Sequence, residues 1–521
     1  MKSFSVWQGL ALCVALLTFG LTIYRSNTQT IAHDEAMEYE LFLDGSISHV
    51  LAFHPTNHVL FTLLAKPIVW TLGNREIVLR FPSLFGTSVY LIALYLLCRR
   101  LFGVGAMLFL SMALLSLNPQ ILDFMAAARG YILGLAAIAV AMYLMACLAE
   151  RGEFNPEDSV WPWGCAAASI SLALSVAANL TNMIPAVCLG VAFSAVTMGS
   201  ARSLFNIGDQ RLREFVRYFF LPGAATFVCI LWPYLIQARP GHFYAGQAQA
   251  IDSLRDVFQG SLLYKWTDDV YASSLGALPI EAGSWQDRVT NLGVFVLLPL
   301  LLCAVAAGVI FARRRRSAAK SSEGACCQIF GGAALGSVAL IAVLHAIARV
   351  HYPDSRLCLF LIPLFTVGAI LAAREIRLRF PSPLLRAVGV VVAVIVIADY
   401  ALAIQTKSFR YNAYDVISRD LYQSIEKDAH SRGLANVRVG GTWWYEPEIN
   451  FYRIRNHATW MLSYDVKDRS YFWETPGALQ PGAYDYFVFV PASDPQLSGP
   501  RVRTIFHDNK TQATIIAISH D

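Results

Sequence analysis

Apolar stretches long enough to cross a lipid bilayer recur along this 521-residue chain, and they decide its fold class. A helix needs about 20 apolar residues to span the hydrocarbon layer. The chain has 56% hydrophobic and 15% charged residues with a mean hydropathy of +0.48, which is too apolar for a soluble protein of this length. About eleven transmembrane helices are predicted. In order they are Ser5–Tyr24, Phe81–Leu101, Val104–Leu117, Tyr131–Ala149, Trp161–Ala178, Met183–Met198, Val216–Ile236, Leu292–Ala312, Ile329–Ala346, Leu357–Ala372 and Ala387–Gln405.

One of these stretches, Val104–Leu117, is shorter than a span usually needs. Asn118 and Pro119 follow it directly, and this dipeptide is typical of a break in a helix. We therefore expect an early bend at this point.

Basic residues indicate the orientation of the helices, because they are enriched in cytoplasmic connections. They gather in alternate connections, at Arg99 and Arg100, Arg151, Arg202 to Arg217, Arg313 to Lys320, and Arg374 to Arg386. With Lys2 inside and an odd number of spans, the loops 25–80 and 237–291 and everything after residue 405 lie on the exported side. For a bacterial inner membrane, which we assume, this is the periplasmic face. The net charge of +5 is then mostly an orientation signal, and no nucleic-acid partner is expected.

Two domains are predicted: a polytopic membrane domain over residues 1–405 and a small exported domain over residues 406–521. The second is mixed in polarity, as a soluble domain is. Helical periodicity over 415–429 and short strand-like runs at 437–440, 486–490 and 514–518 predict an α/β or α+β fold. The aromatic run at Trp443 predicts either a sugar-stacking surface or packing against the membrane domain.

The first exported loop contains two segments with helical patterning, Ala32–Ser48 and His58–Leu72. Apolar residues recur at helical spacing in the first, which is typical of a helix lying along a membrane face. Asp34 and Glu35 stand at its start. A carboxylate in this place can serve as a base or a metal ligand, since partial desolvation tunes its pKa. The structural alternative is a helix N-terminus, where acidic side chains complement the dipole.

Four short motifs then occur in a characteristic order. They are Asp34-Glu35 after the first span, His54-Pro55-Thr56 in the same loop, Arg80-Phe81-Pro82-Ser83 opening the second span, and Ala128-Arg129-Gly130-Tyr131 before a later span. In this order they resemble the polytopic glycosyltransferases of the GT-C fold, in particular glycosyltransferase family 39 with its protein O-mannosyltransferases, and the aminoarabinose transferases. The resemblance covers roughly residues 1–240, and residues 351–356 repeat it more weakly. It implies a GT-C-like catalytic membrane domain.

The resemblance also implies a reaction. Such enzymes transfer one sugar, with inversion, from a polyprenyl-phosphate carrier to a protein, lipid or glycan acceptor on the exported face of the membrane. Asp34 occupies the place of the acidic residue that is taken to act as the base, and Glu35 is expected to orient the acceptor or bind a cation. The acceptor hydroxyl must lose a proton as it attacks, so a nearby carboxylate helps. Phosphate is already a good leaving group, so cations that stabilise its charge matter more than an acid.

Candidates for binding the donor phosphate are Arg129, Tyr131, His54 and Arg356. A guanidinium at the hydrocarbon boundary is costly unless it meets an anion, although snorkelling to lipid headgroups is an alternative for both arginines. His54 stands where aminoarabinose transferases carry a lysine. Because histidine is only partly cationic near neutral pH, this difference favours a neutral sugar over aminoarabinose.

Contacts to substrate or acceptor are predicted for His58 and Tyr352, and for Asp268 and Asp269 in the second exported loop. That loop is long enough to cover an active site. No cofactor follows from these motifs. A divalent metal held by His33, His54 and His58 is an open alternative to structural hydrogen bonds by the same histidines.

Two other classes of function compete with the transferase. A polytopic lipid or sugar transporter, or a flippase, also uses arginines in the membrane, but transporters usually show inverted repeats and spans broken near the midplane. Neither feature is visible in the sequence, where the charged motifs gather at the outer face. A non-catalytic assembly protein fits the exported domain and leaves Asp34 unexplained. The sugar and the acceptor are not encoded in any motif.

Overall fold

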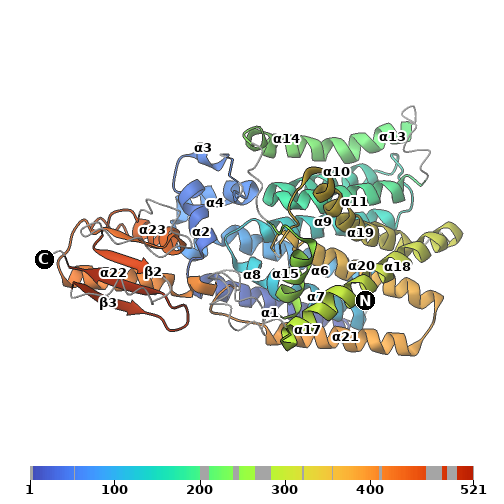
Figure 1. Ribbon diagram of the computed structural model, residues 1–521. Helices are drawn as coiled ribbons and strands as arrows, with labels where there is room; N and C mark the ends of the chain where they lie inside the picture. The colour runs from blue at the N-terminus through green and yellow to red at the C-terminus, as the bar shows by residue number, and fades with distance from the viewer. Residues whose placement is uncertain are drawn as a thin grey trace.

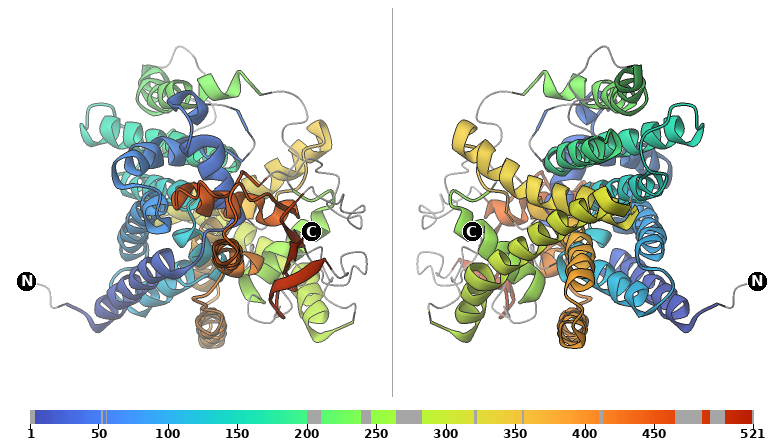
Figure 2. Two further views of the ribbon diagram at one scale, coloured as in Figure 1. Left: turned by 90° about the vertical axis from the view of Figure 1, so that its left-hand side faces the viewer. Right: turned by 90° about the vertical axis from the view of Figure 1, so that its right-hand side faces the viewer.

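The computed structural model describes residues 4–51, 53–54, 56–199, 210–238, 246–263, 283–319, 322–354, 356–409, 413–464, 484–489 and 501–519. Two parts are visible in Figure 1, a bundle of long helices and a small domain of helices and strands at one end of it. The end-on views of Figure 2 show this C-terminal domain over the end of the bundle rather than along its side. The protein is thus a polytopic helical membrane protein with a small C-terminal α+β domain.

Within the described residues, nine helical segments are long and apolar enough to cross a membrane. They are α1 (Val6–Thr28), α6 (Phe81–Phe102), α9 (Tyr131–Ala149), α10 (Val160–Ala178), η2 with α11 (Leu180–Thr197), α13 to α14 (Gln210–Leu235), α17 to α18 (Trp285–Arg315), α19 (Ser322–Ala348) and α21 (Pro383–Leu402). Each coincides with a predicted span. Helix α9 packs against both α6 and α10, and α18, α19 and α20 form a second packed group.

The predicted bend after the short apolar stretch is confirmed. Helix α7 (Ala106–Ser116) and helix α8 (Pro119–Ala126) meet at an angle of 62°, and together they make a tenth candidate span. The Asn118 side chain caps α8 by accepting hydrogen bonds from the backbone N–H groups of Gln120 and Ile121. Pro119, which has no N–H to satisfy, takes the first helical position.

The remaining predicted span, Leu357–Ala372, corresponds to α20 (Leu361–Arg379). This helix packs against α18 and α19, but its second half carries Arg374, Glu375, Arg377 and Arg379. These charges exclude it from the nine apolar segments. A helix that begins in the bundle and ends in water accounts for this pattern.

The loop between α1 and α6 forms short helices at the end of the bundle where the C-terminal domain lies (Figure 1). They are α2 (His33–Glu38), the π-helix η1 (Tyr39–Leu43), α3 (Ile47–Val50), α4 (Val59–Leu72) and α5 (Glu76–Leu79). The buried Lys66 ammonium of α4 donates to the carbonyls of Phe42, Leu43 and Gly45 at the end of η1. A cation suits the negative end of a helix dipole, so α4 stabilises the end of the helical segment that α2 begins at His33 and η1 continues.

The C-terminal domain has helices α22 (Ser418–Ser431) and α23 (Glu446–Arg455) and strands β1 (Val439–Gly441), β2 (Tyr486–Phe489), β3 (Val502–His507) and β4 (Thr514–Ile518). The strand order is β1-β2-β4-β3, with β1 parallel to β2 and the other pairs antiparallel. Three strands and α22 agree with the predicted elements, whereas β3 and α23 were not predicted. Helix α21 ends at Leu402, so the predicted boundary at 405 follows it closely.

One hydrophobic core joins the short helices between α1 and α6 to the C-terminal domain. It contains Ile31, Ala36 and Tyr39 from the membrane domain together with Phe451 and Tyr452 from α23. The rings of Tyr39 and Phe451 meet edge to face at 5.3 Å. Because the same helix carries Asp34, the C-terminal domain supports the candidate site directly.

Candidate active site

Asp34 lies between two guanidinium groups that come from distant parts of the chain. Its Oδ2 is 2.7 Å from Nη1 of Arg356 and 3.9 Å from Nη2 of Arg129. Arg129 also donates from Nη1 to the carbonyl oxygen of Asp34 at 2.9 Å. The side chains of Asp34 and Arg356 are 22% and 20% exposed, whereas that of Arg129 is 4% exposed. The cluster therefore opens to the outside at Asp34 and Arg356.

The two arginines determine the charge state of Asp34. Burial on its own would raise the pKa of this carboxyl, but Arg129 and Arg356 outweigh burial and hold the pKa below its ordinary value. The carboxylate is therefore ionised at physiological pH. A carboxylate held by two cations is a weak base, and it becomes a stronger one only when another anion takes up their charge.

Glu35 has a different environment from its neighbour. It is buried and accepts two hydrogen bonds from Arg80, at 2.9 Å from Nε to Oε1 and at 2.6 Å from Nη2 to Oε2. Backbone N–H groups of Ala32 and Ala128 also donate to it. The remaining N–H groups of Arg80 donate to the carbonyls of Ser26, Gln29 and Thr30 at the end of α1.

These contacts differ from the predicted role of Glu35 in orienting an acceptor or binding a cation. Both of its oxygens are engaged, and the Arg80 side chain is fully buried. The pair ties the end of α1 and the start of α2 to the beginning of α6 and to the backbone next to Arg129. Glu35 is thus a positioning residue that fixes where Asp34 stands relative to Arg129.

Glu38 was assigned no role from the sequence and belongs to the same cluster. Its Oε2 is 3.8 Å from Nη1 of Arg129, and its Oε1 accepts a hydrogen bond from Thr62 at 2.6 Å. Burial raises the pKa of Glu38 to about 7, because Arg129 and Thr62 offset burial only in part. A signal was present in the sequence, since residues four apart share one face of a helix and Glu38 follows Asp34 at that spacing.

His58 and Tyr131 form the apolar side of the cluster. Nδ1 of His58 lies 2.8 Å from the carbonyl oxygen of Ala178, and the ring meets Tyr131 at 4.8 Å. Burial lowers the pKa of His58 to about 3, so the ring is neutral. Nδ1 then carries the proton, and Nε2 is left as an acceptor. The ring of Tyr131 also meets that of Phe124 in a tilted contact, with 4.4 Å between the ring centroids, and Tyr131 is buried.

The histidines predicted as metal ligands lie in three different environments. Nδ1 of His33 is 2.9 Å from the carbonyl oxygen of Trp444, and its ring meets Trp443 at 4.8 Å. Nδ1 of His54 is 2.7 Å from Oγ1 of Thr56, and His58 bonds Ala178 as described. Nowhere in the described part of the chain do three metal-ligating side chains gather into a group. The metal is therefore not assigned to these residues. Trp443 and Trp444 pack against α2, which is the second of their two predicted roles.

The segment that carries Arg356 is held by residues of the chain between α14 and α17. Tyr352 pairs with Gln247 in an isolated antiparallel bridge, and its ring stacks on His345 at 4.2 Å. Ser253 of helix α15 (Ala250–Leu262) donates to the carbonyl of Pro353. Asp268 and Asp269 lie outside the described residues. Tyr352 thus supports the backbone that leads to Arg356.

Taken together, the arrangement provides one ionised carboxylate, two guanidinium groups beside it and a buried carboxyl that can hold a proton near neutral pH. They stand at one end of the helix bundle: Asp34 and Glu38 just after α1, Arg129 just before α9, and Arg356 just before α20. A group of this composition can bind a phosphate and accept a proton from a hydroxyl.

No protein-family model and no curated protein matches the sequence. Solved structures with a similar fold include the oligosaccharyltransferase of Archaeoglobus fulgidus in its apo form, at 13% identity and a TM-score of 0.48, which matches 92% of this chain and 69% of that one. The same enzyme in complex with zinc and sulfate has 14% identity and a TM-score of 0.44, over 92% and 67% of the two chains. ArnT from Cupriavidus metallidurans bound to undecaprenyl phosphate has 12% identity and a TM-score of 0.45, over 98% of each chain. Because these TM-scores are below 0.5, the likeness carries no weight for function.

Proposed function

We propose that this protein is a GT-C-type membrane glycosyltransferase that transfers a single sugar from a polyprenyl-phosphate donor to an acceptor on the exported face. The acceptor is a protein, a lipid or a glycan. For a bacterial chain, the reaction takes place at the periplasmic face of the inner membrane. The observation that carries the proposal is the position of Asp34 between Arg129 and Arg356 at the outer end of the bundle.

The two arginines are suited to the donor phosphate. A guanidinium binds phosphate through paired N–H donors, and two of them can neutralise the charge that grows on the leaving group. Arg356 is partly exposed, and its bond to Asp34 is one that an incoming phosphate can replace. The buried Arg129 stays fixed by its bond to the Asp34 carbonyl.

Donor binding would then activate the base. While Asp34 is alone with the two arginines, its pKa is held low and it takes up a proton poorly. A phosphate that binds the same arginines shares their charge, so the pKa of Asp34 rises towards its ordinary value. The base therefore gains strength only when the sugar donor is in place.

The chemical step balances with these groups. The acceptor oxygen forms a bond to the anomeric carbon while the bond from that carbon to the phosphate oxygen breaks, which inverts the configuration. The acceptor proton passes to Asp34, and polyprenyl phosphate leaves with its new negative charge on the two arginines. Glu38, next to Arg129, is a buried group that can hold this proton after the transfer.

The test is sugar transfer by the full-length protein in lipid, with a panel of labelled polyprenyl-phosphate sugars and a membrane extract as the source of acceptors. Asp34→Asn should reduce transfer by about two to four orders of magnitude, the usual contribution of a general base. Asp44→Asn, which removes an exposed carboxylate in the same loop, is the matched control and should transfer at the wild-type rate.

Full transfer by both Asp34→Asn and Arg129→Ala would contradict the proposed site. Absence of transfer by a folded wild-type protein over the whole panel would favour the transporter or the assembly role. A chelator tests for a metal in the same assay, since no step above uses one.

A further inference from the structure

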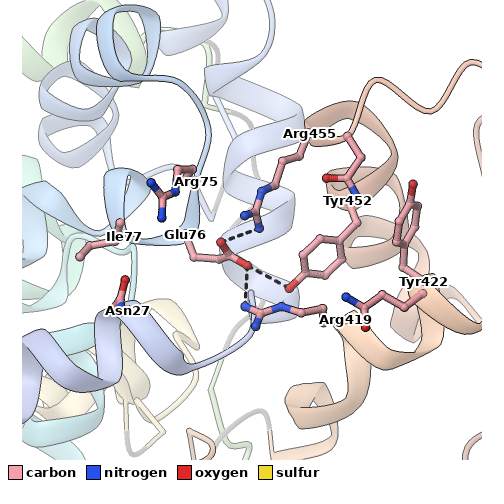
Figure 3. A pocket seen from close by; sticks show the side chains of 10 residues that line it. Asn27, Arg75, Glu76, Ile77, Arg419, Tyr422, Tyr452 and Arg455 are labelled. Carbon is pink, nitrogen blue, oxygen red and sulfur yellow. Dashed lines mark hydrogen bonds and ion pairs between the residues drawn. The ribbon is translucent and has the colours of Figure 1, made fainter.

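A pocket lies on the exported side between the membrane domain and the C-terminal domain. It has a volume of about 360 Å³ and is lined by Asn27, Arg75, Glu76, Ile77, Arg419, Tyr422, Gln423, Tyr452, Arg455 and Asn456. Figure 3 shows Arg75, Glu76 and Ile77 on one side of it and the α22 and α23 side chains on the other. Neither Asp34 nor its two arginines belong to this lining, so the pocket is separate from the candidate active site.

The lining carries an excess of positive charge. It contains three arginines and a single carboxylate, that of Glu76. Glu76 already binds two of these arginines, Arg455 at 2.6 Å and Arg419 at 2.8 Å, and it accepts a weaker bond from the Tyr452 hydroxyl at 3.3 Å (Figure 3). One carboxylate cannot neutralise three guanidinium groups, so the pocket attracts anions.

Arg75 is the third arginine of the lining, and it is not one of the two that pair with Glu76. Its side chain is exposed and makes no hydrogen bond or ion pair within the residues that the structure describes, although it lines the pocket. It is therefore available to a ligand without breaking any contact that holds the two domains together. The polar side chains of Asn27, Gln423 and Asn456 add further donors around it.

The position of the pocket indicates where its ligand comes from. Asn27 lies in the last turn of α1, and Ile77 lies just before α6 begins at Phe81. Both helices are membrane spans, so the pocket stands at the depth of the lipid headgroups on the exported face. Phosphate is the anion that is concentrated at this depth, and arginine binds it through two parallel N–H donors.

We infer that this pocket is a phosphate-binding site, distinct from the Asp34 site, in which Arg75 is the principal ligand and Arg419 and Arg455 contribute charge. The phosphate is either that of an anionic lipid headgroup or that of a soluble phosphate compound. Bound there, it would touch both domains at once. Tyr452 also accepts a hydrogen bond from the N–H of Ile31, three residues before Asp34, so occupancy is linked to the segment that carries the candidate base.

Binding is tested on the full-length protein in nanodiscs of phosphatidylcholine, by titration with sodium phosphate against sodium chloride at matched ionic strength. The readouts are the unfolding temperature and the heat of binding. We expect saturable stabilisation of the wild type and half-saturation at about tenfold higher phosphate in Arg75→Gln. Arg501→Gln removes an exposed arginine of the C-terminal domain that lies outside the pocket, and it should match the wild type.

The Asp34 site also carries two arginines, so a further variant separates the two sites. Arg356→Gln should reach half-saturation at the wild-type phosphate concentration, whereas Arg75→Gln should need about tenfold more. The inference is wrong if Arg75→Gln responds to phosphate like the wild type. It is also wrong if Arg501→Gln loses as much phosphate affinity as Arg75→Gln, or if Arg356→Gln loses the phosphate response instead. Because no sugar transfer is measured, failure of the proposed function leaves this result unchanged.

A second set of nanodiscs, which contain phosphatidylglycerol, identifies the source of the phosphate. If the ligand is a lipid headgroup, these discs should raise the unfolding temperature of the wild type and abolish its response to free phosphate, and Arg75→Gln should show neither effect. If the free phosphate response is unchanged in them, the pocket takes a soluble phosphate compound. Absence of any phosphate or phosphatidylglycerol effect on the wild type would overturn the site altogether.

Discussion

Two separate substitutions, Glu35→Gln and Asp34→Asn, test whether these adjacent carboxylates have different roles. We expect Glu35 to hold the structure of the site in place and Asp34 to act as the base. Glu35→Gln leaves the buried Arg80 without its carboxylate and turns an acceptor of four N–H groups into an amide that can accept on one side only. Removing one partner of a buried ion pair costs about 3–5 kcal/mol. Arg80 keeps three carbonyl acceptors, so we expect a loss near the lower end, about 3 kcal/mol.

Asp34→Asn should behave in the opposite way. Its pair with Arg356 is about one-fifth exposed on each side, so the loss of stability should be about 1 kcal/mol or less. Its rate of sugar transfer should fall by about two to four orders of magnitude. The folded fraction of Glu35→Gln, by contrast, should keep a rate within about tenfold of the wild type, because Arg80 still holds the end of α1.

The assay pairs an unfolding titration in mixed micelles with sugar transfer measured on the protein that remains folded. The double variant Glu35→Gln with Arg80→Met serves as a control, since removal of both charges should cost less than the two single changes added together. A stable Glu35→Gln that is inactive would refute the reasoning, because Glu35 would then take part in the reaction. So would a larger loss of stability in Asp34→Asn than in Glu35→Gln.

Three further results are expected. Arg356→Gln should raise the pKa of Asp34 towards its ordinary value, because one of the two cations beside the carboxylate is removed. The acid limb of kcat/KM should then move to higher pH in a pH–rate profile, and an unchanged limb would show that Arg356 does not influence Asp34. Burial raises the pKa of Glu38 from 4.5 to about 7, so the folded protein holds a proton that the unfolded chain has lost between these pH values. The free energy of unfolding of the wild type should therefore fall by about 3 kcal/mol as pH rises from 4.5 to 7, and unfolding titrations of Glu38→Gln should show a smaller fall. Glu76→Gln should weaken the docking of the C-terminal domain on the membrane domain by about 1–2 kcal/mol, because its two arginine partners are partly exposed. Protease should then release the C-terminal domain faster, and an unchanged rate of release would show that the hydrophobic core alone holds this domain in place.

The transmembrane helices were predictable because each depends only on its own stretch of sequence. The bend at Asn118 and Pro119 was predictable for the same reason, since capping and a missing N–H act locally. In β3, Val502, Thr504 and Phe506 alternate as a strand requires, but the residues between them are Arg503 and the apolar Ile505, so the pattern of polar and apolar residues is irregular.

The meeting of Asp34 with Arg356 could not be derived from the sequence, since it depends on how helices pack. The different environments of Asp34 and Glu35 also depend on how the helices pack, so the sequence could not distinguish the two carboxylates. Their side chains are chemically alike, and only Arg80 and two backbone N–H groups make one of them structural. For His33 the sequence left metal binding and structural hydrogen bonding open, because it gives no sign that the carbonyl of Trp444 lies beside the imidazole.

The bond between Asp34 and Arg356 spans 322 residues, and this has a consequence for biosynthesis. Chains grow at about 5–20 residues per second, so roughly 15–65 s pass between the synthesis of the two ends of this bond. Arg129 arrives only 95 residues after Asp34 and can already compensate its charge. The phosphate-binding half of the site is finished much later, when nearly all of the membrane helices have been inserted. A nascent or truncated chain that ends before Arg356 is therefore expected to insert and remain inert, so that the lipid-linked sugar meets a competent site only on a nearly complete protein.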